Sequence, residues 1–276
     1  MYMEIPFVKL HGNGNDFILI DEYAGEKIPD DMKAHFAALY CDRRFGIGGD
    51  GVLFLQKADG GIRMRLFQPD ESEAEMCGNG IRCLAKYAYD AGYAKSPCTI
   101  QTPAGPVTVK MEYDEDGDFL ADVEMTTPVY DSPGIPAKGS GDFHEIISGY
   151  EVFAVNTGVP HAVVFVRDLD MVDITKVAPP IRRSQIFPAG VNVNLVQVMG
   201  TDSIKIRTWE RGVEGETLSC GTGATACAAL THRLSKTGPV VEVETIGGPL
   251  TITLTNGVFM RGPAETVFSG VLRLEG

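Results

Sequence analysis

Several features that would assign the chain to other protein classes are missing from its sequence. No segment approaches the ~20 consecutive apolar residues that a membrane-spanning helix needs. Met1–Leu10 shows no basic stretch followed by an apolar run. None of the six cysteines forms a CxxC pair, and no set of Cys and His residues has zinc-ligand spacing. We therefore expect a cytoplasmic protein with reduced thiols, no membrane partner and no metal site.

Positive charge is also scarce. Lys and Arg number 24 against 37 Asp and Glu, which gives a formal net charge of −13. Because such a surface disfavours nucleic acid, we expect no nucleic-acid partner, although a local cationic pocket for an acidic small-molecule substrate stays compatible with this charge. The 44% hydrophobic content is typical of globular proteins, and 276 residues suffice for two domains with separate cores.

A short phrase occurs twice in the chain. Cys-Gly-Asn-Gly stands at residues 77–80 and Cys-Gly-Thr-Gly at 220–223, and a helix-forming run follows each copy. A strand-like segment with a central arginine precedes each copy at nearly the same distance, at 64–67 and at 206–209. Two strand–loop–cysteine–glycine–helix units, about half a chain apart, predict two similar lobes. A cysteine from each lobe could then face the other.

Strand-like segments dominate the chain and are mostly joined by short turns. Hydrophobic alternation and turn residues predict strands over 5–10, 17–21, 52–56, 62–67, 99–102, 106–113, 119–125, 151–155, 161–166, 191–198, 203–209, 240–245, 250–255, 258–261 and 265–274. Helical spacing predicts helices over 31–42, 79–91, 169–181 and 223–234. Since the helices do not alternate with the strands, a doubly wound parallel sheet is excluded. We predict an α+β protein with two antiparallel-rich lobes.

The lobe boundary is expected near a segment of irregular composition. Residues 126–141 are rich in Pro, Gly and Ser, and this makes them the best candidate for a crossing between lobes. The last predicted strand could return to the first lobe. We therefore assign residues 1–118 and 264–276 to an N-terminal lobe with Cys77, and 119–263 to a C-terminal lobe with Cys220.

The repeated phrase places a cysteine at the start of a helix. The positive end of the helix dipole favours a thiolate and can lower the pKa of such a thiol below its usual ~8.5. The Gly-x-Gly that follows exposes backbone N–H groups that suit a carboxylate or a phosphate. Two opposed thiols suit stereoinversion beside a carboxylate, because one removes the α-proton and the other returns a proton to the far face. No lysine motif for pyridoxal phosphate is evident, so we expect no cofactor.

Several phrases, in order along the chain, resemble the diaminopimelate epimerase family. They are His-Gly-Asn-Gly-Asn-Asp-Phe at 11–17, Cys-Gly-Asn-Gly-Ile-Arg-Cys at 77–83, Pro-His at 160–161, Glu-Arg-Gly at 210–212 and Cys-Gly-Thr-Gly at 220–223. The resemblance covers essentially the whole chain. It implies two pseudo-symmetric lobes, each a sheet wrapped around a central helix, usually paired as a homodimer. It also implies interconversion of LL- and meso-diaminopimelate in lysine and peptidoglycan precursor synthesis.

The resemblance implies roles for individual residues. Cys77 and Cys220 match the two acid/base cysteines, with Cys77 as proton donor and Cys220 as acceptor in one direction. His161 matches a supporting polar group near the thiols, and Arg211 could hold the distal carboxylate bidentately. The expected substrate-binding residues are Asn15, Gln68, Gly78, Asn79, Asn192, Glu210, Arg211, Gly221 and Thr222.

Three positions depart from a common form of the family. Gly51 stands where a Gln can bind substrate, Gln68 where an Asn often sits, and Val159 where the loop often reads Gly-Asn-Pro-His. These positions concern recognition of the distal end of the substrate rather than proton transfer. Gln68 could still reach with its amide, whereas Gly51 and Val159 could offer only backbone groups.

Two alternative functions are also compatible with a pair of cysteines. A related racemase acting on proline or hydroxyproline would usually have His where this chain has Asn79. A redox-responsive protein could instead join two thiols in a disulfide, but it would not need the Asn, Glu-Arg and His residues.

The remaining cysteines and several charged residues are expected to be structural. Cys41, Cys83, Cys98 and Cys227 are best explained as packing residues. We expect structural or ion-pair roles for Arg65 and Arg82, and a hydrogen bond that braces the glycine loop for His11.

Overall fold

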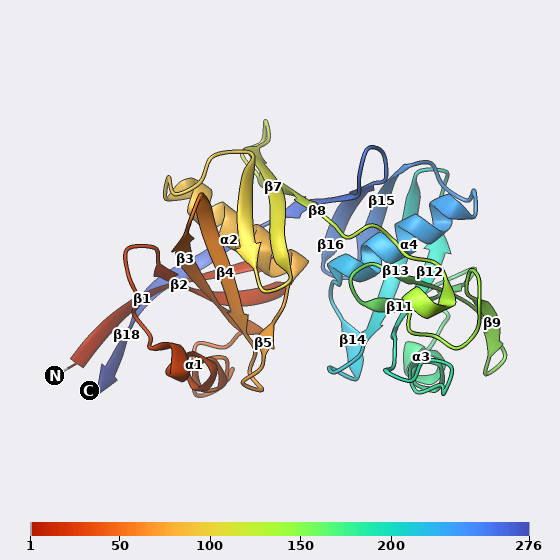
Figure 1. Cartoon of the computed structure of the whole chain (residues 1–276), viewed down its shortest axis with the longest axis horizontal. Coiled ribbons are helices and arrows are strands. Elements are labelled where there is room, and N and C mark those ends of the chain that lie inside the picture. Colours follow the sequence, from red (N-terminus) through yellow and green to blue (C-terminus); the bar gives the residue numbers. More distant parts are fainter. Residues whose placement is uncertain (1, 276) are drawn as a thin grey trace. The chain divides into compact units, whose positions relative to one another are not determined.

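The computed structural model describes residues 2–275 and divides the chain into two compact units (Figure 1). Unit 1 contains Met1–Val123 and Gly262–Gly276, and unit 2 contains Glu124–Arg261. The division predicted from sequence fell at 118/119 and 263/264, a few residues from these bounds. Within the described part of the chain, no helix is both long and apolar enough to span a bilayer.

Unit 1 is a mixed sheet with two α-helices and a 3-10 turn among its described residues. Its strands are β1 (Tyr2–Gly12), β2 (Asn15–Glu22), β3 (Gly51–Ala58), β4 (Gly61–Phe67), β5 (Glu73–Ala74), β6 (Cys98–Thr102), β7 (Gly105–Tyr113), β8 (Phe119–Glu124) and β18 (Glu265–Glu275). Its helices are the 3-10 turn η1 (Asp30–Met32), α1 (Lys33–Tyr40) and α2 (Gly78–Asp90). The strand order is β18-β1-β2-β3-β4-β6-β7-β8, with β5 paired to β4. All neighbours are antiparallel except β2–β3 and β4–β6.

Unit 2 has the same kinds of elements. Its strands are β9 (His144–Ile147), β10 (Tyr150–Asn156), β11 (Pro160–Phe165), β12 (Asn192–Val198), β13 (Ser203–Glu210), β14 (Gly215–Thr217), β15 (Val240–Thr245), β16 (Gly248–Thr253) and β17 (Phe259–Pro263). Its helices are the 3-10 turn η2 (Ser132–Gly134), α3 (Ile174–Arg182) and α4 (Gly221–Arg233). The strand order is β9-β10-β11-β12-β13-β15-β16-β17, with β14 paired to β13.

The two units share one topology. In unit 2 the parallel pairs are β11–β12 and β13–β15, at the same places in the order as β2–β3 and β4–β6 in unit 1. In each unit a short strand and then a long helix follow the central strand that precedes the cysteine phrase. The α+β class and the pseudo-symmetry predicted from the duplicated phrase are confirmed.

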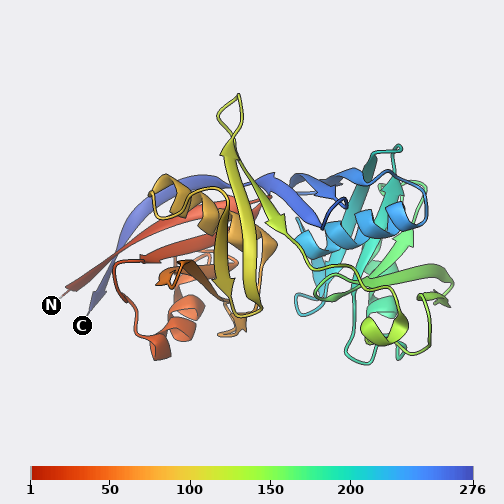
Figure 2. The ribbon, with the colours of Figure 1, turned by 45° about the horizontal axis from the view of Figure 1, so that its top comes forward.

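Each long helix lies at the centre of its own sheet. Helix α2 contacts β1, β2, β3, β4, β7 and β18, and α4 contacts β10 to β13, β15 and β16. Figure 2 shows α4, the blue helix, crossing in front of the strands of unit 2. Nearly every residue of α4 is buried, and its small side chains let the sheet approach closely on all sides. The sheet in each unit therefore wraps around a helix that begins at a cysteine.

The opposite face of each sheet is covered by a shorter helix. Ile18 and Ile20 of β2 pack in one cluster with Phe36 of α1. Their neighbours Phe17 and Leu19 are also buried and point to the other face, toward α2, because successive strand side chains alternate. This two-sided burial explains why β2 is apolar over a continuous run rather than at alternate positions. In unit 2, α3 packs on β12 and β13 in the same way.

Several predicted boundaries were wrong. Helix α3 begins at Ile174 rather than residue 169, because Asp173 caps it by accepting from the Thr175 amide. The helix also continues through the Pro-Pro pair to Arg182. Strands β5, β9 and β14 were missed because strands this short show no alternation. Gly92, with φ 75°, follows the last residues of α2 as predicted.

The segment predicted as the crossing lies inside unit 2. Val129 pairs with Asn156 through two backbone hydrogen bonds, and Ser132 begins the turn η2. The chain passes from unit 1 to unit 2 earlier, after Val123. Proline and glycine mark irregular backbone, but their presence does not reveal whether that backbone is hydrogen-bonded to a domain.

Candidate active site

Cys77 caps the first long helix. Its backbone is extended, with φ −144° and ψ 117°, and its Sγ accepts a hydrogen bond from the Gly80 amide at 3.4 Å. The sulfur therefore lies at the N-terminal end of α2, where the first backbone amides and the helix dipole favour negative charge. The cysteine is half-buried, so a small molecule can reach it.

Asn15 and Asn79 lie beside this sulfur. Asn15 begins β2 directly after the turn in which Asn13 and Gly14 take positive φ. Its Oδ1 lies 3.8 Å from Cys77 Sγ and 3.3 Å from Asn79 Nδ2. The structure thus brings together three residues that sequence reasoning assigned to the site from segments far apart in the chain.

The buried side chain of Arg82 holds Asn13 and Asn79 in place. Its side chain is fully buried and donates to Asn13 Oδ1 at 2.6 Å and to Asn79 Oδ1 at 3.0 Å. Burial lowers the pKa of Arg82 to about 10, so the guanidinium stays protonated at neutral pH. Gly12 leaves the guanidinium room, since a Cβ there would lie 3.1 Å from Nη2. The prediction of a structural role for Arg82 did not include this direct support of Asn79.

Acidic residues hold Asn15 from the other side. Its Nδ2 donates to Asp50 Oδ2 at 2.5 Å, and Arg43 bridges Asp50 and Asp16 at 2.8 Å and 2.6 Å. Burial of Asp16 opposes its ionisation, but hydrogen bonds from Arg43 and Lys9 outweigh burial and hold its pKa at about 2. The Asp16 carboxylate can therefore act only as an acceptor at neutral pH.

The three positions that depart from the common family form are less central. Gln68 is exposed at the end of β4, and among the described side chains it accepts from Ser72 at 3.0 Å. A Cβ on Gly51 would lie 2.6 Å from Leu66 Cδ1 and 3.0 Å from the Phe67 carbonyl, so this position leaves no room for a side chain. Val159 lies in the turn between β10 and β11.

Cys220 occupies the N-cap position of α4, as Cys77 does in α2, but the capping hydrogen bond of the Cys77 sulfur is not repeated there. Its backbone is again extended, with φ −128° and ψ 109°, and 8% of the residue is exposed. The Thr222 hydroxyl lies 3.4 Å from its Sγ. Gly223 lies on the next turn, where a Cβ would fall 2.6 Å from Asn194 Oδ1. The glycine is therefore required by close packing against β12.

His161 is the fully buried neighbour of this loop. Its Nε2 lies 2.9 Å from Thr222 Oγ1, and its Nδ1 lies 3.1 Å from Asn194 Nδ2. Burial, with a smaller contribution from the positive charge of Arg211, lowers the pKa of His161 to about 3. The imidazole is therefore neutral at physiological pH. Asn194 was not among the predicted site residues, although two asparagines within one predicted strand are unusual and were the available signal.

The remaining predicted residues gather at one end of β12 and β13. Asn192 pairs in register with His161, and its Oδ1 accepts from the Arg211 amide at 2.7 Å. Glu210 Oε1 accepts from Thr217 Oγ1 at 2.6 Å. Arg211 donates to the Ala189 carbonyl at 3.0 Å. The structure therefore places a carboxylate and a guanidinium in the loop that leads to Cys220.

The other cysteines have packing roles, as predicted. Cys41, Cys83 and Cys227 are buried, and burial raises the pKa of Cys41 and of Cys83 to about 12. Burial also raises the pKa of Cys227. Cys98 lies in β6, where burial raises its pKa to about 11. These thiols stay protonated at neutral pH and are poorly suited to acid/base work.

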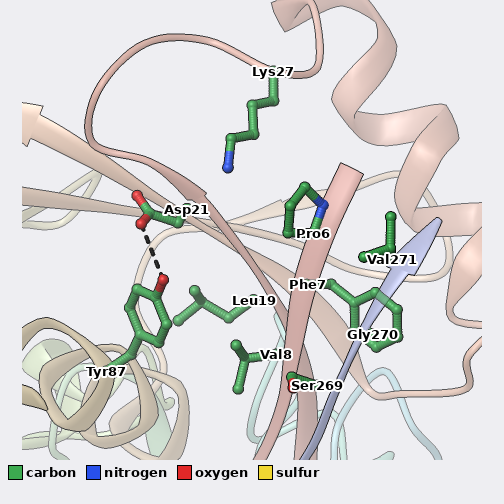
Figure 3. Close-up of a pocket in the computed structure, with 10 residues that line it drawn as sticks. All are labelled: Pro6, Phe7, Val8, Leu19, Asp21, Lys27, Tyr87, Ser269, Gly270 and Val271. Atoms are coloured by element: carbon green, nitrogen blue, oxygen red, sulfur yellow. Dashed lines mark hydrogen bonds between the residues drawn. The ribbon is translucent and has the colours of Figure 1, made fainter. Parts of the chain in front are cut away.

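A separate pocket of about 310 Å³ lies between β1, β2 and β18 (Figure 3). Asp21 accepts there from Tyr87 at 3.0 Å, and Lys27 lies at its edge. None of the residues that line it belongs to the cysteine loops. Over the described residues, no three or more His, Cys, Asp or Glu side chains are grouped so that they could hold a metal ion.

The fold is shared with solved structures of low sequence identity. A PhzF-family phenazine biosynthesis protein from Bacillus anthracis superposes with a TM-score of 0.73 at 16% identity, covering 98% of this chain and 99% of that one. A hydroxyproline epimerase from Agrobacterium vitis superposes with a TM-score of 0.68 at 17% identity, covering 99% and 93%. The chain therefore has the two-unit fold found in PhzF proteins and in proline-type epimerases.

Sequence similarity gives the particular family. The diaminopimelate epimerase profile matches residues 7–130 and 153–267. A diaminopimelate epimerase from Methanothrix thermoacetophila is 54% identical over 98% of this chain and 96% of its own length. One from Methanocella arvoryzae is 50% identical over 99% and 98%. The chain belongs to the diaminopimelate epimerase family and is an isomerase.

Proposed function

We propose that the protein interconverts LL-2,6-diaminopimelate and meso-diaminopimelate, with Cys77 and Cys220 as its two acid/base groups. The observation that carries this proposal is the duplicated cysteine cap. Each unit places a thiol and a Gly-x-Gly turn at the start of a buried central helix. Relatives that are 54% and 50% identical carry the name of this activity.

The proposed chemistry is a two-base proton transfer. One thiolate takes the α-hydrogen as a proton, and the C–H electron pair stays on the α-carbon and spreads into the carboxylate. The other thiol then gives its proton to the opposite face of that carbon. Thiol and thiolate have exchanged places, and the reverse reaction restores them. No cofactor is required, and the step fits lysine and peptidoglycan precursor synthesis in the cytoplasm.

Fixed donors would stabilise the negative charge that develops on the carboxylate. In unit 1 we assign this role to Gly78 and Asn79 at the start of α2, with Asn15 beside them. In unit 2 we assign it to Gly221 and Thr222 at the start of α4. Amides already aligned by a helix need no reorganisation during the reaction, so they lower its barrier.

The distal end of the substrate would bind at the end of β12 and β13. Asn192, Glu210 and Arg211 offer an amide, a carboxylate for an ammonium group and a guanidinium for a carboxylate. His161 would support Cys220 through Thr222. Gln68 is proposed as a peripheral contact, because its amide is exposed at the end of β4.

Proton exchange tests the proposed function. Reduced protein is incubated with LL-diaminopimelate in D₂O, and α-deuterium and the meso product are followed by NMR. We expect both to appear, and to be lost in Cys77→Ala and in Cys220→Ala. Cys98→Ala, outside both loops, is the matched control and should retain exchange.

Other outcomes would reject the proposal. Exchange with proline or hydroxyproline alone would leave a two-thiol racemase with another substrate. If no amino acid exchanged while all thiols were reduced, a redox role would be the better account of the paired cysteines.

We also propose that two copies pair as a homodimer through β18. Val267, Phe268 and Val271 of β18 are 55%, 47% and 55% exposed, and Met3 of the neighbouring β1 is 47% exposed. Exposed apolar side chains on a strand at the edge of a sheet are unfavourable in water and are typical of a buried interface. Phe268→Glu should shift the mass measured by light scattering to that of a monomer, whereas Ile246→Glu, an exposed apolar position in unit 2, should not. An unchanged mass in Phe268→Glu would contradict this interface.

A further inference from the structure

Asn194 is a fully buried amide in the middle of β12, and its orientation is determined by its neighbours. The Ala162 carbonyl, which can only accept, lies 3.1 Å from one end of the amide, so that end must be Nδ2. The Thr208 hydroxyl donates to Oδ1 at 2.9 Å. Turning the amide over would set its oxygen against the Ala162 oxygen.

This orientation determines the tautomer of His161. The same Nδ2 lies 3.1 Å from His161 Nδ1, and because the NH₂ group donates, Nδ1 must accept. The imidazole is neutral, so its one ring proton is then on Nε2. That N–H donates to Thr222 Oγ1 at 2.9 Å.

The Thr222 hydroxyl must therefore donate its own hydrogen to a group other than His161. Its oxygen accepts from His161, and Cys220 Sγ lies 3.4 Å away. A hydrogen bond donated to sulfur stabilises the thiolate relative to the thiol. The Ala162 carbonyl therefore sets which group donates and which accepts in each hydrogen bond of the series, as far as the Cys220 sulfur.

We propose that Asn194 is a positioning residue of this site: it holds His161 in the Nε2–H tautomer, which makes Thr222 a hydrogen-bond donor and holds Cys220 as the thiolate. The catalytic consequence rests on the proposed function, in which Cys220 must begin one direction of the reaction as a base. The tautomer and the state of the sulfur do not depend on that function and can be measured without a substrate.

The corresponding contacts in unit 1 have the opposite polarity. Asp50 accepts from Asn15 Nδ2 and Arg82 donates to Asn79 Oδ1, so both amides are oriented by groups that can play only one role. As a result Asn15 presents its oxygen to Cys77 Sγ at 3.8 Å, and an oxygen acceptor favours the S–H form. The neighbouring side chain thus offers an acceptor to the sulfur of Cys77, whereas Thr222 offers a donor to the sulfur of Cys220.

The first test is the tautomer of His161, measured from the ¹⁵N shifts of its ring nitrogens in the full-length protein. Wild type should show the proton on Nε2. In Asn194→Asp a carboxylate replaces the donor, so the proton should move to Nδ1 and the two shifts should exchange. A folded Asn194→Asp protein that keeps the proton on Nε2 would overturn the proposal.

The second test is the reactivity of the sulfur. Thiolates, not thiols, react with iodoacetamide, and peptide mass spectrometry resolves the rate at each cysteine. In Asn194→Asp the Cys220 rate should fall about tenfold, the effect of roughly one unit of thiol pKa, while the Cys77 rate stays within about twofold. An unchanged Cys220 rate would overturn the proposal.

Two further variants separate positioning from general structure. Thr208→Val removes a contact to Asn194 but keeps both acceptors of its Nδ2, so it should retain the Nε2–H tautomer and the Cys220 rate. Equal losses in Thr208→Val and Asn194→Asp would mean that Asn194 acts only through packing. If Asn194→Asp does not fold, Asn194→Ala should give a mixture of tautomers, and a pure Nε2–H form would overturn the proposal. A protein that turns over no diaminopimelate but passes these tests would reject only the proposed function.

Discussion

Arg82 in unit 1 and His161 in unit 2 are both buried titratable residues, but only Arg82 is charged at neutral pH. Arg82 stays protonated although it is fully buried, because carbonyl and amide oxygens surround it. His161 is equally buried, and burial, with a smaller contribution from the positive charge of Arg211, lowers its pKa so that it stays neutral. Burial lowers the pKa of both groups, but the ordinary pKa of arginine is so much higher that Arg82 stays charged at neutral pH.

Arg82→Met should destabilise the protein. Methionine keeps much of the apolar stem but removes every N–H donor, so Asn13 and Asn79 lose a buried partner. We expect the free energy of unfolding to fall by about 3 kcal/mol in urea denaturation. Arg63→Met, on an exposed position of β4, is the matched control and should change it by less than about 0.5 kcal/mol. Equal stability of the two variants would show that the guanidinium is dispensable.

His161 should make stability depend on pH in a predictable direction. Its pKa in the folded protein, about 3, is below the ordinary ~6.5, so the unfolded chain binds the proton more readily. The stabilisation is therefore complete above about pH 6.5 and is lost as the pH falls toward about 3, with a slope of up to about 1.4 kcal/mol per pH unit.

Urea denaturation between about pH 4 and about pH 7 measures this slope. His161→Gln should reduce it, whereas His35→Gln should leave it unchanged, because the His35 side chain is 56% exposed. A slope that is the same in wild type and His161→Gln would contradict the buried, neutral imidazole.

Equivalent elements of the two units differ in how tightly they pack. The helices α2 and α4 occupy the same place in the topology, and each has a glycine three residues after its cysteine. A Cβ on Gly80 would meet nothing closer than Leu53 at 3.4 Å, an ordinary contact. A Cβ on Gly223 would lie 2.6 Å from Asn194 Oδ1. The duplicated glycine thus has a steric cause in only one helix.

Gly223→Ala should destabilise the protein by about 1–3 kcal/mol, because the added methyl group must displace the buried Asn194 amide. Gly80→Ala is the matched variant. It should be neutral or stabilising by up to about 1 kcal/mol, since alanine is the better helix former. Thermal and urea denaturation compare the two. Similar effects at both positions would mean that Asn194 moves aside without cost.

At the scale of the whole chain, the C-terminal strand completes the first unit. Strand β18 pairs with β1 along nearly its full length, so the two ends of the chain lie side by side in unit 1 (Figure 1). Unit 2 is formed by the continuous segment Glu124–Arg261. Unit 1 therefore depends on contacts between residues more than 250 positions apart, and unit 2 does not.

Removing residues 265–276 should therefore loosen one unit selectively. Without β18, the edge of β1 loses its partner and amides in β1 and β2 should exchange with deuterium at least about tenfold faster. Amides of β12 and β13 in unit 2 should exchange at wild-type rates and act as the internal control. Hydrogen exchange read by mass spectrometry gives both. A uniform increase across both units would contradict their separate stability.

The sequence by itself was sufficient for the repeated architecture, the cysteine caps and most strands. The duplicated phrase is local, because a helix start and its N-terminal charge preference depend on adjacent residues. The resemblance to the family also predicted Asn15, Asn79 and His161 as site residues. Only the tertiary structure decided which amides face which sulfur, because the orientation of Asn194 depends on β11 and β13, and that of Asn15 depends on Asp50. It also showed that Gly51 has no space for a side chain, since that space is filled by Leu66 from the neighbouring strand.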